Sequence, residues 1–254
     1  MGATERRFSA IDGTPLHYWR WNDGTAGQRS EQRAFVGTNE LHDRLVGWLR
    51  EVRALSARHA SLGPVTRIVS AGAYVNKPGQ HGLGRAFDLD QVLWSNGACT
   101  PYHHEHGSGD IAIVRRYLAV DALARRHFRF VLDGGYNRAH ADHLHLDLGG
   151  VPIRCDRASR SDTAFVQMVA NAHLGSGLAV DGAWGPRTQT AFDESLRRLG
   201  VAGDPHAPGR PWLDWLHHTA RHGFANRAFG QPTPVRQPSL LDPLTDLLDG
   251  LLKP

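Results

Sequence analysis

Two short segments with alternating polar and apolar positions stand out in the middle of the chain. In residues 143–148, three leucines alternate with two histidines and an aspartate, and in residues 86–90 Phe87 and Leu89 alternate with alanine and aspartate. A period of two residues is typical of a strand that buries one face. The pattern therefore predicts two strands whose leucine and phenylalanine side chains face the core, while histidine and aspartate share the opposite, open face.

Other segments carry apolar residues at helical spacing. Residues 38–60 and 110–127 repeat an apolar residue every three or four positions, which predicts two amphipathic helices. The same spacing predicts three further helices, at about residues 165–174, 188–199 and 212–221. Helices on one side of a small antiparallel sheet, followed by a small three-helix C-terminal domain, predict an α+β fold.

Changes in composition suggest domain boundaries. The predicted units are an N-terminal arm (1–37), a first domain (38–152), a polar linker (153–161), a helical domain (162–229) and a tail (230–254). The tail begins with a Pro- and Gln-rich stretch. Residues 240–252 then predict an amphipathic helix, with leucines on one face and three aspartates on the other. This helix is too short to span a membrane, and its acidic face disfavours an anionic bilayer, so we expect it to dock on this chain or to bind a protein partner.

The open face of the two predicted strands carries the candidate chemistry. His81 precedes the first strand in a glycine-rich turn, which folds it back toward Asp88 and His145. Because the chain has 16 histidines, the prediction depends on the joint pattern and not on any one of them. Two imidazoles and one carboxylate, with a fourth position left to water, form the catalytic type of zinc site. The sequence therefore predicts one Zn²⁺ per chain, which would lower the pKa of bound water to about 7 and polarise a carbonyl.

A second group of metal-ligand types lies in the segment His103-His-Glu-His106. It falls between a proline and a glycine in no regular predicted element, so its side chains would not be pre-oriented. We expect a solvated loop near the rim of the site, although a second metal site stays an alternative.

The motif HxxGxAxD that begins at His81 resembles the first zinc motif of metallopeptidases that include D-Ala-D-Ala carboxypeptidases, lysostaphin-like endopeptidases and hedgehog domains. Residues 130–137 (FVLDGGYN) followed by 140–148 resemble more closely the extensin-like C-terminal family of bacterial proteins. Residues 74–78 (YVNKP) are similar to a further block of that family. The resemblance covers about residues 65–150.

This resemblance implies a fold, an activity and a set of contacts with substrate. The family usually carries Cys and Arg where this chain has Asn76 and Lys77, so a disulfide normally made there is absent. The side chains that we expect to contact substrate are Arg67, Tyr74, Lys77 and His140.

The C-terminal region shows a second resemblance. Residues 178–188, followed by Ala191 and Phe192, are similar to the centre of the three-helix peptidoglycan-binding domain, over about residues 162–222. The similarity weakens at the third helix, which follows a proline-containing insertion. Together the two resemblances imply a zinc peptidase of bacterial peptidoglycan, either a D,D-carboxypeptidase or an endopeptidase. A catalytic unit beside a wall-binding unit raises the effective concentration of the enzyme on a polymer.

A peptidase needs a proton acceptor beside the metal. His143 lies two residues before the last ligand, as in relatives with His-x-His, and Asp142 lies three before it, where carboxypeptidase relatives carry Glu in Glu-x-x-His. By strand alternation His143 shares the face of His145, whereas Asp142 points away unless the backbone bulges. We therefore expect His143 to be the base or transition-state donor, supported by Asp142 or His140.

Charge and targeting signals refine the picture. The formal net charge of +4 and pI near 9.4 fit loose attraction to an anionic polymer such as the wall. No aromatic and basic stripe points to nucleic acid. Cys99 and Cys155 either pair or remain free thiols, and two cysteines do not settle the redox compartment.

The first residues lack a signal peptide or a transmembrane helix. Action in the periplasm or cell wall would then require phage lysis, an injection device, another leaderless route, or a leader removed from the sequence. Two further functions stay open. One is a peptidoglycan-binding structural or injected module of a larger particle whose metal is only structural. The other is a metallopeptidase of a different peptide.

Overall fold

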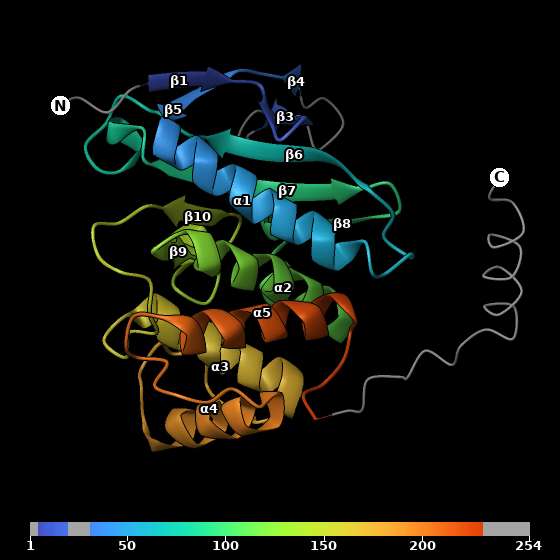
Figure 1. Ribbon diagram of the computed structural model, residues 1–254, viewed down its shortest axis with the longest axis vertical. Helices are drawn as coiled ribbons and strands as arrows, with labels where there is room; N and C mark the ends of the chain where they lie inside the picture. The colour runs from blue at the N-terminus through green and yellow to red at the C-terminus, as the bar shows by residue number, and fades with distance from the viewer. Residues whose placement is uncertain (1–4, 20–30, 231–254) are drawn as a thin grey trace, which may run out of the picture.

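The computed structural model describes residues 5–19 and 31–230 (Figure 1). Its α-helices are α1 (Asn39–Ser56), α2 (Ile111–His127), α3 (Arg160–Leu174), α4 (Pro186–Leu199) and α5 (Arg210–Phe224). Its strands are β1 (Glu5–Phe8), β2 (Ala10–Ile11), β3 (Thr14–Tyr18), β4 (Glu31–Gln32), β5 (Phe35–Thr38), β6 (Val65–Gly72), β7 (Ala86–Trp94), β8 (Gly97–Cys99), β9 (Phe130–Leu132) and β10 (Leu144–Asp147). The predicted α+β class with three C-terminal helices is confirmed.

The main sheet has the strand order β2-β3-β6-β7-β10-β9, with β4 paired to β3 and β8 paired to β7; β1 and β5 form a separate pair. The central pairs β6–β7, β7–β10 and β10–β9 are antiparallel, as the alternation predicted. The sheet is nevertheless mixed, because β3 and β6 run parallel. A parallel pair needs a long crossover connection, and α1 lies within the segment that joins β3 to β6.

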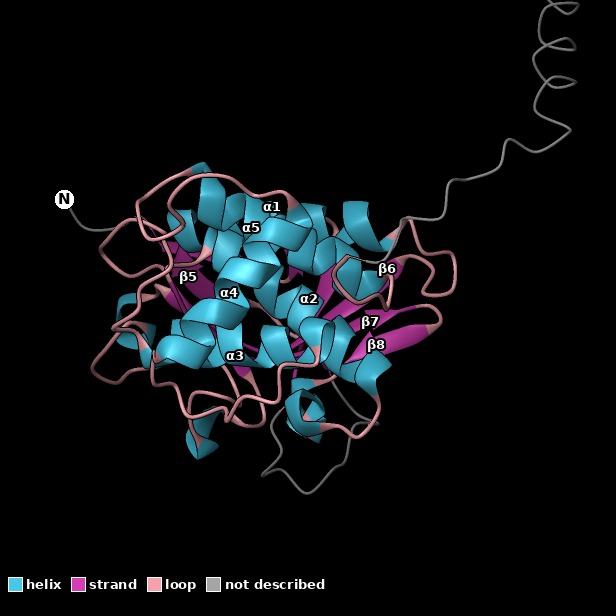
Figure 2. Cartoon of the chain, turned by 90° about the horizontal axis from the view of Figure 1, so that it is seen from below, coloured by secondary structure: helices cyan, strands magenta, loops and turns pink. Residues whose placement is uncertain are grey.

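The helices cover one face of the main sheet, and Figure 2 shows them layered in front of the strands. Phe87, Leu89, Leu144 and Leu146 are fully buried in the core that this face shares with α1 and α2. The two predicted helices begin at side-chain caps: the hydroxyl of Thr38 accepts a hydrogen bond from the amide of residue 41, and the Asp110 carboxylate accepts one from residue 112. The polar face of β7 and β10 is thereby left free of helices for the site.

The N-terminal residues do not form a separate arm. Residues 5–18 form β1, β2 and β3 and join the sheets, and Phe8, Trp19 and Phe35 are buried. These strands are at most five residues long, too short for a period of two to be recognised in the sequence. The tail at 231–254 lies outside the described residues, so its predicted helix stays a prediction.

The helical region and the sheet share one core. Residues of α2 (Leu118), α3 (Phe165) and α5 (Trp215) belong to the same buried cluster, and Figure 1 shows α5 stacked directly against α2. Cys155, within the predicted polar linker, is also buried. Within residues 153–161 only Cys155 and Ser161 are buried, whereas Arg154, Arg157, Ala158 and Arg160 are exposed, in keeping with the polar composition of this segment.

A buried ion cluster also joins these two regions. The Arg125 guanidinium, in α2, donates to Asp121 at 2.8 Å, to Asp133 at 2.8 Å and to Asp162 of α3 at 3.1 Å. All four side chains are at most 4% exposed. Arg129 also pairs with Asp162, at 3.3 Å. Burial, together with the charge of the neighbouring Asp133, raises the pKa of Asp121 well above its usual value. The cluster fixes α3 to the end of the sheet that carries β9.

Both cysteines are free thiols: Cys99 lies in β8 and Cys155 precedes α3, and each is fully buried. The structure therefore decides between the two alternatives that the sequence left open. Within the described ranges, no helix combines the length and the apolar character that crossing a membrane would require.

Candidate metal centre

Neighbouring strands place two of the predicted ligands opposite each other. Asp88 in β7 and His145 in β10 are register partners, and their apolar neighbours on both strands point into the core. The distance from His145 Nδ1 to Asp88 Oδ1 is 2.9 Å. The alternation in the sequence therefore predicted which side chains would share this face.

A short 3₁₀ turn, η2 (His81–Leu83), brings the third ligand over the strands. The turn ends at Gly84, whose φ of 63° lies in the left-handed region that favours glycine. Gly82 is required for a different reason: a Cβ built there would lie 1.8 Å from the carbonyl oxygen of Lys77. The sequence His-Gly-x-Gly thus folds tightly enough to direct the His81 ring at the sheet.

The three ligand atoms converge on one point. His81 Nε2 lies 3.1 Å from Asp88 Oδ1 and 3.1 Å from His145 Nδ1. A tetrahedral zinc ion with bonds of about 2.0–2.1 Å separates its ligand atoms by about 3.3 Å. The three atoms observed here therefore fit around one small ion. Among the described residues, this is the one group of at least three His, Cys, Asp or Glu side chains that is arranged to hold a metal.

The outer nitrogens of both rings have partners that fix their tautomers. His81 Nδ1 donates to the Ala73 carbonyl at 2.5 Å, and His145 Nε2 lies 3.5 Å from the Asp147 carboxylate. With the outer nitrogens as donors, both inner nitrogens can turn lone pairs toward the Asp88 carboxylate once they carry no proton. This set of acceptors then suits a cation, which would take the place of any proton held between them.

The pKa values of Asp88 and His145 also indicate a site that holds positive charge. Burial alone would raise the pKa of Asp88, but hydrogen bonds from His145 and His81 hold it well below its usual range. Burial opposes a charge on His145, yet Asp147 and Asp88 together raise the pKa of that imidazole to about 9. In the metal-free site a proton on His145 supplies the positive charge that the carboxylates require. A metal ion would replace this proton.

The predicted base lies beside the triad. His143 stands immediately before β10, and its Nε2 is 3.8 Å from Asp88 Oδ1. Its Nδ1 is held at 2.8 Å by the Asp142 carboxylate. Asp142 therefore orients His143 and does not itself face the ligand atoms. His140, on the turn η5 (Arg138–His140), packs on this pair with ring centroids 5.2 Å from His143 and 5.8 Å from His145.

The predicted substrate contacts have different surroundings. Burial, followed by the charges of His143 and His145, lowers the pKa of His140 to about 4, so this ring is neutral. Tyr74 is 45% exposed and lines a pocket of about 350 Å³, directly after the Ala73 residue that holds His81.

Lys77 and Arg67 complete the predicted set. The Lys77 side chain is exposed, and its backbone carbonyl packs against the η2 turn. Arg67 lies in β6 opposite Leu93, whereas Asp88 pairs with Gly72 at the other end of the same strand. At about 3.3 Å per residue this separates Arg67 from the triad by roughly 15 Å. The structure brings His140 to the site, places Tyr74 and Lys77 beside it, and leaves Arg67 away from it.

The histidine-rich loop does not form a second metal-binding group within the described residues. His104 Nδ1 pairs with the carbonyl of Ala141 at 3.1 Å, and His106 packs against Gly134 and Tyr117. The loop therefore borders the segment that carries His140 to His143. The segment is more ordered than the solvated loop that we expected, because it forms two 3₁₀ turns, Pro101–His103 and Glu105–Gly107, and buries Glu105.

Two partners of the site were not anticipated from the sequence: the Asp147 carboxylate and the Ala73 carbonyl. Asp147 continues the alternation two residues after His145, and this spacing is the signal that could have identified it. A backbone carbonyl leaves no such signal, because any residue can provide one.

Comparison with known proteins identifies a family for the region that contains the site. A family model described as "Extensin-like protein C-terminus" matches residues 24–155, just over half of the chain. The matched segment contains all three ligand residues, and α3, α4 and α5 follow it. No curated protein and no solved structure gives a significant match to the chain.

Proposed function

Because the chain belongs to the extensin-like C-terminal family, we propose that it is a zinc-dependent peptidase of bacterial peptidoglycan, acting as a D,D-carboxypeptidase or an endopeptidase on stem peptides or cross-links. The observation that carries the proposal is the convergence of two imidazole lone pairs and an ionised carboxylate, with the His143–Asp142 pair beside them. A structural zinc site is usually closed by four protein ligands, whereas this triad provides three.

His81, Asp88 and His145 would hold the ion. Zinc in such a site supplies polarisation of a carbonyl and activation of water. His143 would act on the proton: its Nδ1–H donates to Asp142, which leaves the Nε2 lone pair directed toward the triad. From there Nε2 can take a proton from the attacking water and then, once protonated, donate to the leaving amine. The neutral ring of His140 packs against His143 and limits the access of bulk water to it.

The helical region offers a way to hold the polymer. We propose that α3, α4 and α5 bind peptidoglycan and keep the catalytic face close to its substrate. The protein would then act in the periplasm or cell wall. The support is the sequence resemblance of residues 162–222 to the peptidoglycan-binding domain, together with the presence of three helices there. The core that these helices share with α2 would fix their position relative to the triad.

A purely structural metal is the second candidate, and one observation favours it. The triad ties together residues 81, 88 and 145, which are far apart in the chain, so an ion there would also cross-link the fold. Removal of zinc distinguishes the two: a structural ion contributes folding free energy outright, whereas a catalytic ion leaves a folded, inactive protein.

The decisive experiment is mass spectrometry of muropeptides after digestion of purified peptidoglycan with zinc-loaded protein. We expect a fragment that is absent with His145→Ala, and its mass would identify the bond cleaved. Walls of Gram-positive and Gram-negative type should both be used, because their cross-links differ. If no fragment appears from either wall, the peptidase assignment is wrong, and binding of the same walls would then test the non-catalytic alternative.

A further inference from the structure

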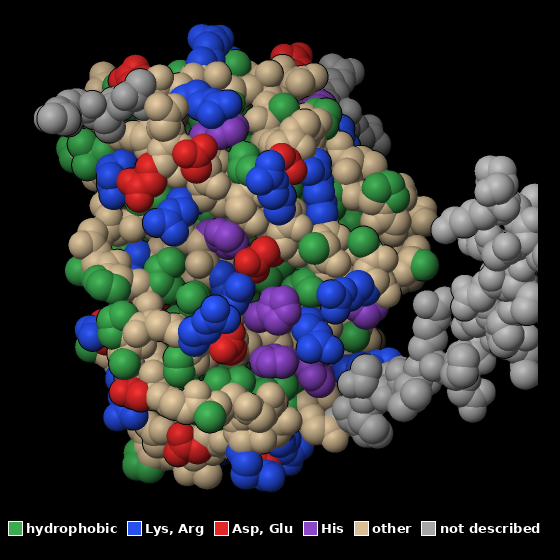
Figure 3. Space-filling model, in the orientation of Figure 1, with side chains coloured by type: hydrophobic (Ala, Val, Ile, Leu, Met, Phe, Trp, Pro, Cys, Tyr) green, Lys and Arg blue, Asp and Glu red, His purple; other side chains and the backbone are tan. Residues whose placement is uncertain are grey.

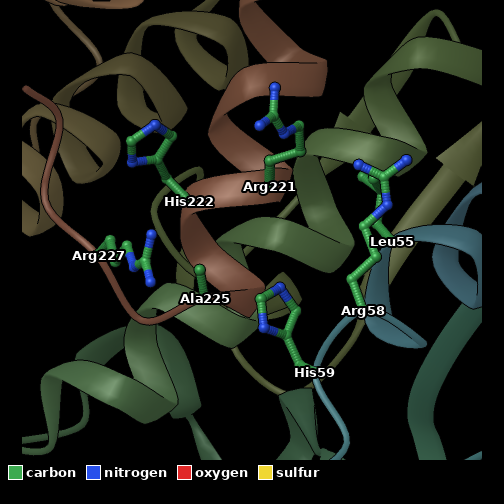
Figure 4. Close-up of a pocket in the computed structure, with 7 residues that line it drawn as sticks. All are labelled: Leu55, Arg58, His59, Arg221, His222, Ala225 and Arg227. Atoms are coloured by element: carbon green, nitrogen blue, oxygen red, sulfur yellow. The ribbon is translucent and has the colours of Figure 1, made fainter. Parts of the chain in front are cut away.

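A second pocket lies where the ends of two helices meet on the helical side of the molecule (Figure 4). It has a volume of about 260 Å³. Arg58 and His59 follow the end of α1, and the remaining polar groups come from the last turn of α5 and the residues after it. The lining consists of Leu55, Arg58, His59, Arg221, His222, Ala225 and Arg227.

This pocket is separate from the metal centre. The triad lies on the face of the sheet opposite the core, whereas α1 and α5 belong to the layers on the core side. No residue of the pocket lies within the segments that carry His81, Asp88 or His145. The proposed peptidase activity therefore gives no account of it.

The lining is strongly cationic and carries no carboxylate. Within the described part of the chain, the side chains of Arg58, Arg221 and Arg227 have no hydrogen-bond or ion-pair partner. The nearby Glu51 is already engaged, since it accepts from Arg126 at 2.6 Å and 3.1 Å. In Figure 3 basic side chains and histidines gather on this face over α5.

The helix ends account for only part of this charge. Basic residues are favoured at helix C-termini, because each end carries a partial charge of about −0.5. The two ends at this pocket offset about one positive charge, whereas three guanidinium groups line it. About two positive charges are left uncompensated in a concave site.

The positive charges of these arginines also affect the two histidines that line the pocket. Burial lowers the pKa of His59, and the charges of Arg227 and Arg58 lower it further. Burial also lowers the pKa of His222, and Arg221 is among the charges that add to this effect. Both rings are therefore neutral near pH 7 and can donate hydrogen bonds without adding to the repulsion.

We propose that this pocket binds a phosphate group. Guanidinium groups match the geometry of phosphate oxygens through paired N–H donors, and the buried Leu55 side chain provides an apolar floor that strengthens such contacts. A water molecule takes about 30 Å³ in the liquid, so the pocket has room for roughly nine. This is more than one phosphate ion needs and leaves space for part of a molecule esterified to it.

The test is a calorimetric titration of the full-length protein with inorganic phosphate at constant ionic strength. We expect saturable binding, and an increase in Kd of about tenfold or more in Arg58→Gln and in Arg227→Gln, as loss of a charge-assisted hydrogen bond implies. Arg210→Gln is the matched control, because it removes the same charge from the other end of α5. Its Kd should remain within about twofold of the wild-type value, as its guanidinium does not line the pocket.

Two further arms identify the source of the phosphate and separate this site from the metal centre. Glycerol 1-phosphate and poly(glycerol phosphate) are titrated in parallel. Tighter binding of glycerol 1-phosphate by the wild type would indicate a phosphate monoester, and tighter binding of the polymer would indicate a phosphodiester. In either case the binding should be lost in Arg227→Gln. His145→Ala should bind phosphate with an unchanged Kd, even if the protein has no peptidase activity. Absence of saturable phosphate binding, or an equal loss in Arg210→Gln, would overturn the proposal.

Discussion

Asp88 and His145 lie directly opposite each other on antiparallel strands, with Oδ1 and Nδ1 2.9 Å apart. Two of the three ligand side chains are therefore positioned by the strand register itself, which the buried leucines on the other face hold in place. The third ligand, His81, depends on a glycine-dependent turn. Because two ligands depend on strand register and the third depends on a turn, we expect metal binding to be weakened by changes in the backbone as well as by loss of a ligand.

Replacing His145 by alanine should abolish metal binding. The change removes one of three protein ligands and leaves Asp88 without the partner that lies 2.9 Å away. Metal content after dialysis, measured by inductively coupled plasma mass spectrometry, should fall from one zinc per chain to nearly none. His104→Ala is the control, because its ring contacts the Ala141 carbonyl and not the triad, so it should keep one zinc. Loss of zinc in His104→Ala would assign a metal role to the histidine-rich loop.

Gly82→Ala should weaken metal binding without removing any ligand. The added Cβ would overlap the Lys77 carbonyl oxygen, so the turn must shift and carry His81 away from the two strands. A displacement of this kind is expected to weaken zinc affinity by about tenfold to a hundredfold, similar to the loss of a supporting contact. Competition with a chromophoric chelator gives the affinity. Gly109→Ala, where the Cβ meets nothing within 4 Å, should leave it unchanged.

Much of this site was predictable because its ligands lie in patterns of short range. Alternation placed His145 and Asp88 on one face, and the glycines on either side of Leu83 indicated the turn. The register that aligns the two strands is a tertiary property, so it could be inferred only from resemblance. The Ala73 carbonyl that orients His81 carries no side-chain signal at all.

The fold was also predictable where its elements have a clear pattern in the sequence. Long amphipathic helices such as α1 and α2 were evident from their spacing, whereas the strands at residues 5–18 were too short to be recognised. The relation between the helical region and the sheet depends on contacts distant in sequence, such as Arg125 with Asp162. The polar composition of residues 153–161 indicated the exposed arginines there, but it gave no sign of these contacts or of the buried Cys155.

His143→Ala should retain zinc and lose most of the activity. Its Nε2 approaches the triad without being part of it, so its removal leaves all three ligand atoms in place. Loss of a general base typically costs about 10²–10⁴ in rate. Asp142→Asn should lose less, about tenfold to a hundredfold, because it only orients the ring. Both variants are compared by the initial rate of muropeptide release at equal zinc content. Full activity of His143→Ala would exclude the base assignment.

Arg125→Met should destabilise the protein strongly, although it lies outside the site. The substitution keeps similar volume but leaves the carboxylates of Asp121 and Asp133 buried without a cation, and leaves Asp162 with Arg129 alone. Removing one partner from a buried ion cluster typically lowers the free energy of unfolding by about 3–5 kcal/mol. Urea-induced unfolding followed by tryptophan fluorescence measures this change. Arg44→Met removes a half-exposed arginine 3.8 Å from Glu40 and should cost at most about 1 kcal/mol.

His173 should make the protein acid-sensitive. Its ring is almost fully buried, donates from Nδ1 to the Arg227 carbonyl at 2.8 Å and stacks on Phe229. Burial lowers the pKa of this imidazole to about 3, whereas the pKa of a histidine in an unfolded chain is about 6.5. Because the folded pKa is the lower one, the stabilisation is fully present above about pH 6.5 and is lost progressively as the pH falls toward 3. Between pH 7 and pH 5 the loss amounts to about 2 kcal/mol in the free energy of unfolding.

The effect of His173 can be isolated with a substitution that does not titrate. In His173→Asn the amide nitrogen can replace Nδ1 as donor to Arg227, so the variant should fold, though with lower stability at pH 7. Urea unfolding is then measured for both proteins at pH 7, 6 and 5. Carboxylates and the other histidines titrate in both, so they cancel in the difference between the two free energies. That difference should shrink by about 2 kcal/mol toward pH 5, because only the wild type must keep a neutral imidazole buried. A difference that stays constant with pH would show that His173 takes up its proton as readily in the folded protein as in the unfolded chain.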